Sequence, residues 1–152
     1  MYEFISHSEE DTINFANDFA KKLNKHSIIV LSGDLGSGKT KFTEGLLRYF
    51  GLDDEISSPT FTIVNEYIKN DFNIYHFDLY RLSEEDEFYA MGGEEYLQNG
   101  LCIFEWGEMI EDILPNKYIK ITFTRDLENV NYRKLRIEEI NNENTISWYF
   151  FC

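Results

Sequence analysis

The sequence predicts an α/β domain of three layers, with a mainly parallel central sheet and some antiparallel strands. Three observations lead to this fold class. The chain has 152 residues, the usual length of one domain. Apolar residues make up 43% of it and aromatic residues 16%, a composition that can fill a core. A compact apolar run at residues 27–31 precedes a glycine-rich segment, and an amphipathic helical pattern follows.

The first third of the chain alternates predicted strands and helices. Residues 2–6 favour a short strand, and Ser8-Glu9-Glu10-Asp11 has the form of a capping box before a helix. Apolar side chains then recur at helical spacing, at Phe15, Ala16, Phe19, Ala20 and Leu23. Residues 27–31 are typical of a buried strand. The next helix is predicted from the apolar face formed by Phe42, Leu46, Leu47 and Phe50, and Gly51 is expected to end it.

The remainder of the chain is predicted to hold mainly strands. These are expected at residues 61–68, 73–80, 101–104, 118–124, 132–140 and 146–151. Lys69-Asn70-Asp71 would form a hairpin turn between the first two, and residues 141–144 another turn. The acidic segment 83–97 predicts one or two short helices, interrupted at Gly92-Gly93. No repeat or linker is visible, so residues 1–152 are expected to form a single domain.

The charge balance limits the partners of the chain. Its formal net charge is −14, from 28 acidic residues against 14 lysines and arginines. Because phosphate binding depends on lysine and arginine, we expect no unaided binding to nucleic acid or to an anionic membrane. Any contact with RNA would go through a partner.

The sequence also predicts where the protein works. No segment reaches the ~18 apolar residues of a membrane helix, and the N-terminus lacks the features of a secretory signal. Cys102 and Cys152 form no metal-binding pair. We therefore expect a reduced, cytoplasmic protein that does not act at a membrane.

The glycine-rich segment carries the strongest motif. Gly33-Asp34-Leu35-Gly36-Ser37-Gly38-Lys39-Thr40 matches the pattern G-x-x-x-x-G-K-[ST] at every fixed position. Its glycines let the backbone approach phosphates closely, and successive N–H groups form an anion nest at the start of the helix. Lys39 is expected to be exposed to the nucleotide and to bind its β- and γ-phosphates, while the Thr40 hydroxyl ligates Mg²⁺. This motif, with Lys41 after it, predicts a P-loop NTPase-type domain that uses ATP and Mg²⁺.

Two acidic residues follow apolar runs and are candidates for the second half of the site. They are Asp78, after residues 74–77, and Glu105, after residues 101–104, on a strand that is expected to be more central. One carboxylate could bind the metal while the other orients the attacking water. Alternatively, one of them only caps a strand end or pairs with a base.

Other polar and aromatic residues leave alternatives open. Thr60 and Thr62, after Ser57-Ser58-Pro59, could approach the γ-phosphate as a switch loop does, or could be ordinary strand threonines. Arg81 could stabilise the transferred phosphate, although a salt bridge is the simpler expectation. His76 is expected to be a packed histidine and not a base. Trp106 could pack near the nucleotide or fill the core.

These motifs together resemble one family. The P-loop segment is followed by Ser58-Pro59-Thr60-Phe61, then by residues 76–82 (His-Phe-Asp-Leu-Tyr-Arg-Leu), then by Glu105-Trp106. In this order the chain resembles, over residues 1 to 140, the bacterial TsaE family, P-loop ATPases of tRNA threonylcarbamoyladenosine biosynthesis. Gly107 is a departure, because the family usually has proline there, and the aromatic segment 148–151 fits no family motif.

The resemblance implies a function and a set of roles. The protein would hydrolyse ATP to support repeated modification of tRNA by TsaB-like and TsaD-like proteins, which transfer threonylcarbamoyl to an adenosine next to the anticodon. Lys39 would bind phosphate, and Thr40 and Glu105 would hold Mg²⁺. Asp78 would be the other active-site acid, and the Thr60 region the switch loop. Residues 8–12 would lie near the adenine.

Two other functions remain open from the residues alone. A small-molecule kinase shares the P-loop, but it usually needs a basic lid, and the arginines here are few and scattered. A nucleotide-gated scaffold would bind ATP tightly and scarcely hydrolyse it.

Overall fold

The computed structural model describes residues 1–33, 38–52, 63–69 and 72–141. Its strands are β1 (Tyr2–Ser6), β2 (Ile28–Gly33), β3 (Val64–Lys69), β4 (Phe72–Asp78), β5 (Leu101–Glu105), β6 (Lys117–Arg125) and β7 (Arg133–Asn141). Its α-helices are α1 (Glu9–Phe19), α2 (Lys39–Tyr49), α3 (Glu85–Ala90) and α4 (Gly93–Asn99), and short 3₁₀ helices span Ala20–Lys22 and Gly107–Ile113. Within these ranges no helix is long and apolar enough to cross a membrane.

The described strands form one seven-stranded sheet in the order β1-β7-β6-β2-β5-β4-β3. Its centre is parallel, because β2 pairs with both β5 and β6, and β5 pairs with β4. The flanks are antiparallel, through β3 with β4 at one edge and through β6, β7 and β1 at the other. Parallel strands place their carboxyl ends at one edge of the sheet, where α/β proteins bind ligands.

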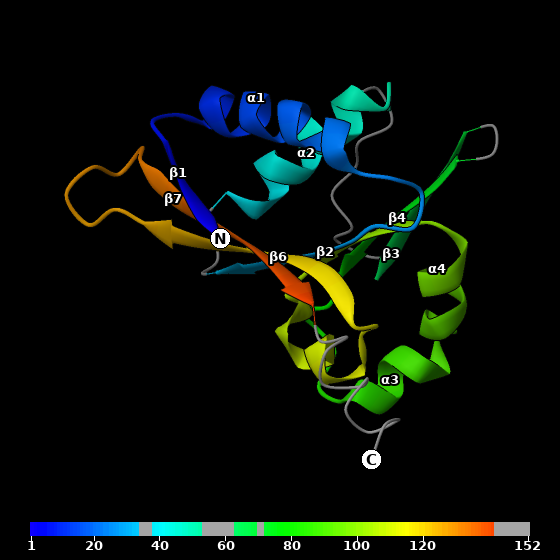
Figure 1. Cartoon of the computed structure of the whole chain (residues 1–152). Coiled ribbons are helices and arrows are strands. Elements are labelled where there is room, and N and C mark those ends of the chain that lie inside the picture. The colour runs from blue at the N-terminus through cyan, green and yellow to red at the C-terminus, as the bar shows by residue number, and fades with distance from the viewer. Residues whose placement is uncertain (34–37, 53–62, 70–71, 142–152) are drawn as a thin grey trace, which may run out of the picture.

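Helices cover both faces of the sheet, which gives the three layers (Figure 1). On one face, α1 and α2 pack over a core that includes Ile29, Leu31 and Ile103. On the other, α3, α4 and the 3₁₀ helix at Gly107–Ile113 pack over Phe77 and Phe104. The central strand β2 is buried along residues 28–32, as its continuous apolar run predicted.

A glycine sets the distance between the two helices beside the site. A Cβ atom added at Gly45 of α2 would lie 2.3 Å from the carbonyl oxygen of Ile13 in α1. Only glycine therefore permits this approach, which brings the N-terminal ends of α1 and α2 to the same side of the sheet.

The predicted fold class and most elements are confirmed. Ser8 caps the helix as predicted, with Asp11 N donating to Ser8 Oγ at 3.0 Å, although the Asp11 carboxylate accepts from His7 N at 3.0 Å and not from the N–H of Ser8 as in a full capping box. The two short helices of the acidic segment are separated at Gly92, which has φ +85°. The predicted last strand at residues 146–151 lies outside the described residues.

Three expectations about elements were incomplete. The strand predicted at residues 73–80 ends at Asp78, because Leu79 N donates instead to the carbonyl of Glu105. Asn141 belongs to β7 and pairs with Lys117, whereas it was expected to begin a turn. The 3₁₀ helix after Glu105 was not predicted, since its seven residues are too few for a helical period to stand out.

Candidate nucleotide site

The P-loop motif lies where the sequence predicted it, between β2 and α2. Strand β2 ends at Gly33 with φ +133°, and Gly38 precedes α2 with φ +108°; both values lie in the region that favours glycine. Residues 34–37 of the motif (Asp34, Leu35, Gly36 and Ser37) lie outside the described residues. The N-terminal end of α2 faces the carboxyl edge of the parallel strands, and the positive end of the helix dipole favours an anion there.

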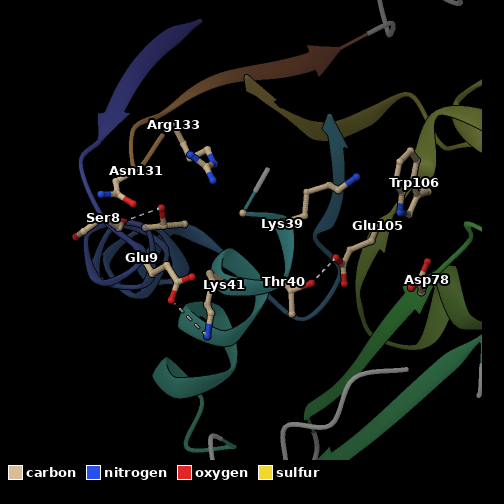
Figure 2. A pocket seen from close by; sticks show the side chains of 12 residues that line it. Ser8, Glu9, Lys39, Thr40, Lys41, Asp78, Glu105, Trp106, Asn131 and Arg133 are labelled. Atoms are coloured by element: carbon tan, nitrogen blue, oxygen red, sulfur yellow. Dashed lines mark hydrogen bonds and ion pairs between the residues drawn. The ribbon is translucent and has the colours of Figure 1, made fainter. Parts of the chain in front are cut away.

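A pocket of about 410 Å³ opens at this edge of the sheet (Figure 2). The residues that line it come from α1, α2, β4, β5 and the β6–β7 hairpin. They are Ser8, Glu9, Thr12, Gly38, Lys39, Thr40, Lys41, Asp78, Glu105, Trp106, Asn131 and Arg133. This volume falls within the range of small-molecule sites, about 300–1,000 Å³.

Lys39 lines the pocket but is largely buried. Its side chain lines the pocket, yet the residue is only 4% exposed. Its Nζ donates to the carbonyl of Gly33 at 2.7 Å and lies 3.4 Å from the centroid of the Trp106 ring. Lys39 thus lines the pocket, as expected of a residue that faces the nucleotide, while the Gly33 carbonyl and the indole face shield its ammonium group from solvent.

Thr40 and Glu105 meet across the pocket although they are 65 positions apart in the sequence. Thr40 Oγ1 donates to Glu105 Oε1 at 3.2 Å, and Glu105 is 5% exposed. The other carboxylate oxygen, Oε2, contacts Nε2 of the buried His76. A hydroxyl and a carboxylate at this distance are oxygen ligands of the kind that Mg²⁺ prefers.

Asp78 lies directly beside Glu105 in the sheet. The two residues are register partners at the carboxyl ends of β4 and β5. Asp78 is partly exposed and lines the pocket, and its Oδ1 accepts from Tyr80 N at 3.1 Å. The structure thus brings both predicted acids to one site, with Glu105 bound to neighbouring side chains and Asp78 closer to solvent.

Trp106 and Arg81, the aromatic and the basic candidate, differ in their position relative to the pocket. Trp106 lines the pocket and stacks at a tilt on Tyr80, with ring centroids 5.0 Å apart. It has φ +62°, an uncommon value outside glycine, and its ring lies against Nζ of Lys39. Arg81 is exposed and does not line the pocket. Thr60, Thr62 and residues 57–59 lie outside the described residues.

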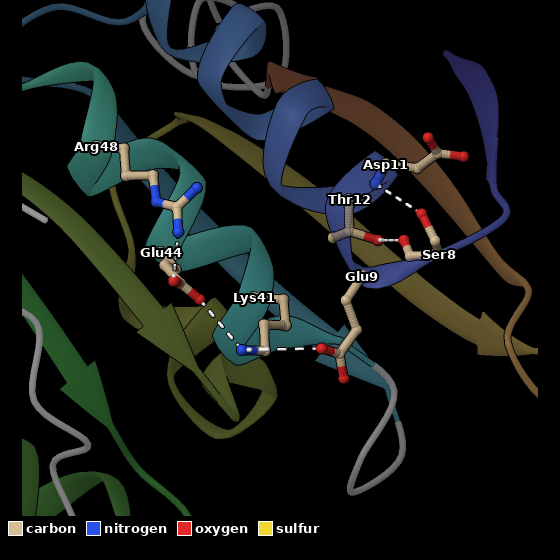
Figure 3. Close-up of polar contacts among 7 residues, drawn as sticks. All are labelled: Ser8, Glu9, Asp11, Thr12, Lys41, Glu44 and Arg48. Atoms are coloured by element: carbon tan, nitrogen blue, oxygen red, sulfur yellow. Dashed lines mark hydrogen bonds and ion pairs between the residues drawn. The ribbon is translucent and has the colours of Figure 1, made fainter.

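The start of α1 also lines the pocket, at the end opposite the acids (Figure 2). Ser6 and Thr12 share a buried hydrogen bond of 2.6 Å that fixes this helix start against β1. Lys41 joins α1 to α2, since its Nζ lies 3.9 Å from Glu9 and 3.3 Å from Glu44 (Figure 3). Glu44 in turn pairs with Arg48 at 3.0 Å.

Two pocket residues were missed by the sequence reasoning. Asn131 and Arg133 come from the β6–β7 hairpin, far from every motif. Nη1 of Arg133 donates to the carbonyls of Val130 and Tyr132, at 2.6 and 2.8 Å. Nothing in the local sequence marks them, because they reach the pocket only through the pairing of β7 with β1 and β6.

The fold and the site together define a class of protein. A buried parallel strand leads through glycines into a helix that begins with Lys39 and Thr40, and an acidic residue from a neighbouring strand meets Thr40. This is the architecture of a P-loop NTPase-type α/β domain. The model of the TsaE family, described as threonylcarbamoyl adenosine biosynthesis protein TsaE, matches residues 6–135, and the chain belongs to this family.

Relatives and a solved structure agree with this assignment. The chain is 45% identical over 118 residues to the tRNA threonylcarbamoyladenosine biosynthesis protein TsaE of Rickettsia bellii, covering 77% of this chain and 82% of that protein. The protein of the same name from Bacillus subtilis is 38% identical over 117 residues, covering 76% and 73%. The crystal structure of Bacillus subtilis YdiB matches with a TM-score of 0.71 at 28% identity, over 95% of this chain and 89% of that one.

Proposed function

We propose that this protein is a Mg²⁺-dependent ATPase that hydrolyses ATP to ADP and phosphate in support of tRNA N6-threonylcarbamoyladenosine formation. The single observation that carries the ATPase proposal is the contact of Thr40 Oγ1 with Glu105 Oε1 at 3.2 Å, beside Lys39 and the N-terminus of α2. A hydroxyl, a carboxylate and an ammonium group converge on a cavity large enough for a small ligand.

Lys39 and the start of α2 are the groups that would bind the phosphates. The ammonium group is held at the pocket wall by a carbonyl and an indole face, so a phosphate must draw it away from these contacts. The helix N-terminus adds its backbone N–H groups and the positive end of its dipole. Gly33, Gly38 and Lys41 complete the described part of the phosphate-binding segment.

Thr40 and Glu105 are the residues that would hold Mg²⁺. Their oxygens fit the ion, which prefers oxygen ligands and is often held by one or two carboxylates with phosphates and water. When bound, Mg²⁺ neutralises charge on the phosphate oxygens. Asp78, the more exposed acid of the pair, would accept a hydrogen bond from the attacking water and orient it.

Catalysis at such a site is mainly electrostatic. The chain's own groups act by holding the γ-phosphate and the water in line and by placing positive charge where negative charge develops. Burial of Lys39 and Glu105 strengthens these interactions, because a low-dielectric environment screens them less.

The role in tRNA modification is proposed from the family. Relatives at 36–45% identity carry the name tRNA threonylcarbamoyladenosine biosynthesis protein TsaE. We propose TsaB-like and TsaD-like proteins as partners in the cytoplasm. A chain of net charge −14 would repel the tRNA backbone, so tRNA contact would be made by the complex.

ATP turnover measured with and without the TsaB–TsaD pair tests the ATPase proposal and separates its alternatives. We expect Mg²⁺-dependent release of phosphate that is slow alone and faster with the pair. Turnover that appears only with an added small-molecule acceptor would indicate a kinase. Tight ATP binding without phosphate release, even with both partners, would indicate a nucleotide-gated scaffold.

A further inference from the structure

We propose that His76 is the positioning residue of this site, holding the Glu105 carboxylate in the orientation that receives Mg²⁺. This inference rests on the proposed function and adds a residue to it. His76 is 3% exposed and does not line the pocket, so it cannot touch the nucleotide itself. Any effect it has on the reaction must pass through a neighbour.

Glu105 is that neighbour. His76 and Glu105 lie on adjacent parallel strands, and Ile103 is the register partner of His76. His76 therefore stands two residues deeper in the sheet than Glu105, on the same face. Its Nε2–H donates to Glu105 Oε2, which leaves Oε1 directed at Thr40. The two oxygens of the Glu105 carboxylate are thus held by different groups, Oε2 by the imidazole and Oε1 by the Thr40 hydroxyl.

The other ring nitrogen of His76, Nδ1, supports the importance of the contact between Nε2 and Glu105. His76 Nδ1 is buried and has no hydrogen-bond partner within residues 1–33, 38–52, 63–69 and 72–141. Burying a polar atom without a partner is unfavourable, and an apolar side chain would fill this position, between Ile74 and Asp78, at less cost. Among the described residues, the polar contact that explains a histidine here is the one with Glu105.

The geometry matches a known way of tuning metal sites. A ligating carboxylate is commonly fixed by a hydrogen-bond donor outside the coordination sphere, and loss of that donor typically lowers metal affinity or activity by about 10–100-fold. Without His76, Glu105 could rotate its carboxylate away from Thr40. The Mg²⁺-dependent part of ATP binding would then weaken, while contacts made by Lys39 and α2 would persist.

The test compares ATP dissociation constants measured in saturating Mg²⁺ and in EDTA. The ratio of the two constants is the gain in affinity from Mg²⁺. We expect His76→Leu to reduce this gain by about 10-fold or more, with little change in EDTA. His76→Gln, which keeps an N–H donor, should retain most of the gain. His76→Phe replaces the leucine variant if circular dichroism shows that the latter does not fold.

Two controls separate positioning from general loss of structure. Ile74→Ala removes buried volume from the same face of β4 without touching Glu105, so it should lower the melting temperature and leave the Mg²⁺ gain unchanged. In a Glu105→Gln background, His76→Leu should reduce the Mg²⁺ gain by a further factor of less than about 2, because both substitutions disrupt the same His76–Glu105 pair.

The outcomes distinguish this inference from the proposed function. The role of His76 is overturned if His76→Leu gains as much ATP affinity from Mg²⁺ as the wild type does. It is also overturned if the loss of this gain in the double variant equals the product of the losses in the two single variants. Either result leaves the ATPase proposal intact. A wild-type protein that binds no ATP under either condition overturns both.

Discussion

Replacement of Lys39 by methionine isolates the charge of the P-loop lysine. Methionine keeps an unbranched side chain of similar length in a position that is only 4% exposed, and it removes the ammonium group. We expect ATP binding to weaken strongly while the fold persists. Both effects can be worked out from the contacts that Lys39 makes.

The loss of affinity is limited by the contacts that already exist. Before ATP binds, the ammonium group has a hydrogen bond to Gly33 O and a cation–π contact with Trp106. Only the surplus of the phosphate contacts over these counts toward binding. Taking that surplus as about 2–3 kcal/mol, in the range of hydrogen bonds to charged groups, the dissociation constant rises about 30- to 140-fold.

The loss of stability should be small. The variant gives up one charge-assisted hydrogen bond and one cation–π contact, of about 1.5–3 and 0.5–2 kcal/mol. It also avoids burying an ammonium group, which offsets much of this loss. We expect a net destabilisation of no more than about 2 kcal/mol, or a fall in melting temperature of less than about 8 °C for a domain of this size.

Titration with ATP at fixed Mg²⁺, together with a thermal melt, measures both quantities. Lys120→Met is the matched control, because Lys120 is also partly buried, at 27% side-chain exposure, and paired, with Glu111 at 3.0 Å. It lies outside the pocket and should leave the ATP dissociation constant unchanged. Equal affinities of the wild type and Lys39→Met would refute the assignment of the phosphate site.

Three further predictions follow from the acids and the buried thiol. Glu105→Ala should lose Mg²⁺-dependent turnover more completely than Glu108→Ala, because Glu105 contacts Thr40 and lines the pocket whereas Glu108 does not line it. If a phosphate-release assay finds Glu108→Ala inactive and Glu105→Ala active, the assignment of Glu105 as the metal ligand is wrong. Asp78→Asn should lose most turnover and keep nucleotide binding, as titration and phosphate release would show, whereas parallel loss of both would assign Asp78 to binding. Burial raises the pKa of the Cys102 thiol to about 12, so at pH 8 only about one thiol in ten thousand is ionised; native Cys102 should resist a thiol reagent that labels it in denaturant, and fast native labelling would contradict its burial.

The sequence predicted the fold because its signals were local. The apolar run of β2, the glycines at 33 and 38, and the amphipathic face of α2 lie within about 20 consecutive residues, and their periods differ clearly. The antiparallel pairing of β1 with β7 carries no such signal, because it joins the two ends of the described chain.

The site was predictable only as far as motifs extend. Lys39, Thr40, Asp78 and Glu105 follow from spacing, since carboxyl ends of neighbouring parallel strands meet at one edge. The contact of His76 with Glu105 depends on which strands are adjacent and on how a side chain turns, and spacing determines neither. His76 was expected to be packed, and it is buried, but its partner could not be foreseen.

We propose above that ATP hydrolysis at this P-loop supports repeated tRNA modification. The most direct measurement is the number of threonylcarbamoyladenosine residues formed per TsaD-like molecule, with the TsaB–TsaD pair, tRNA, ATP, Mg²⁺ and an excess of threonylcarbamoyl donor. We expect several turnovers when the wild-type chain is added, and about one when the chain is omitted or replaced by Lys39→Met. Equal numbers of turnovers in all three reactions would contradict it.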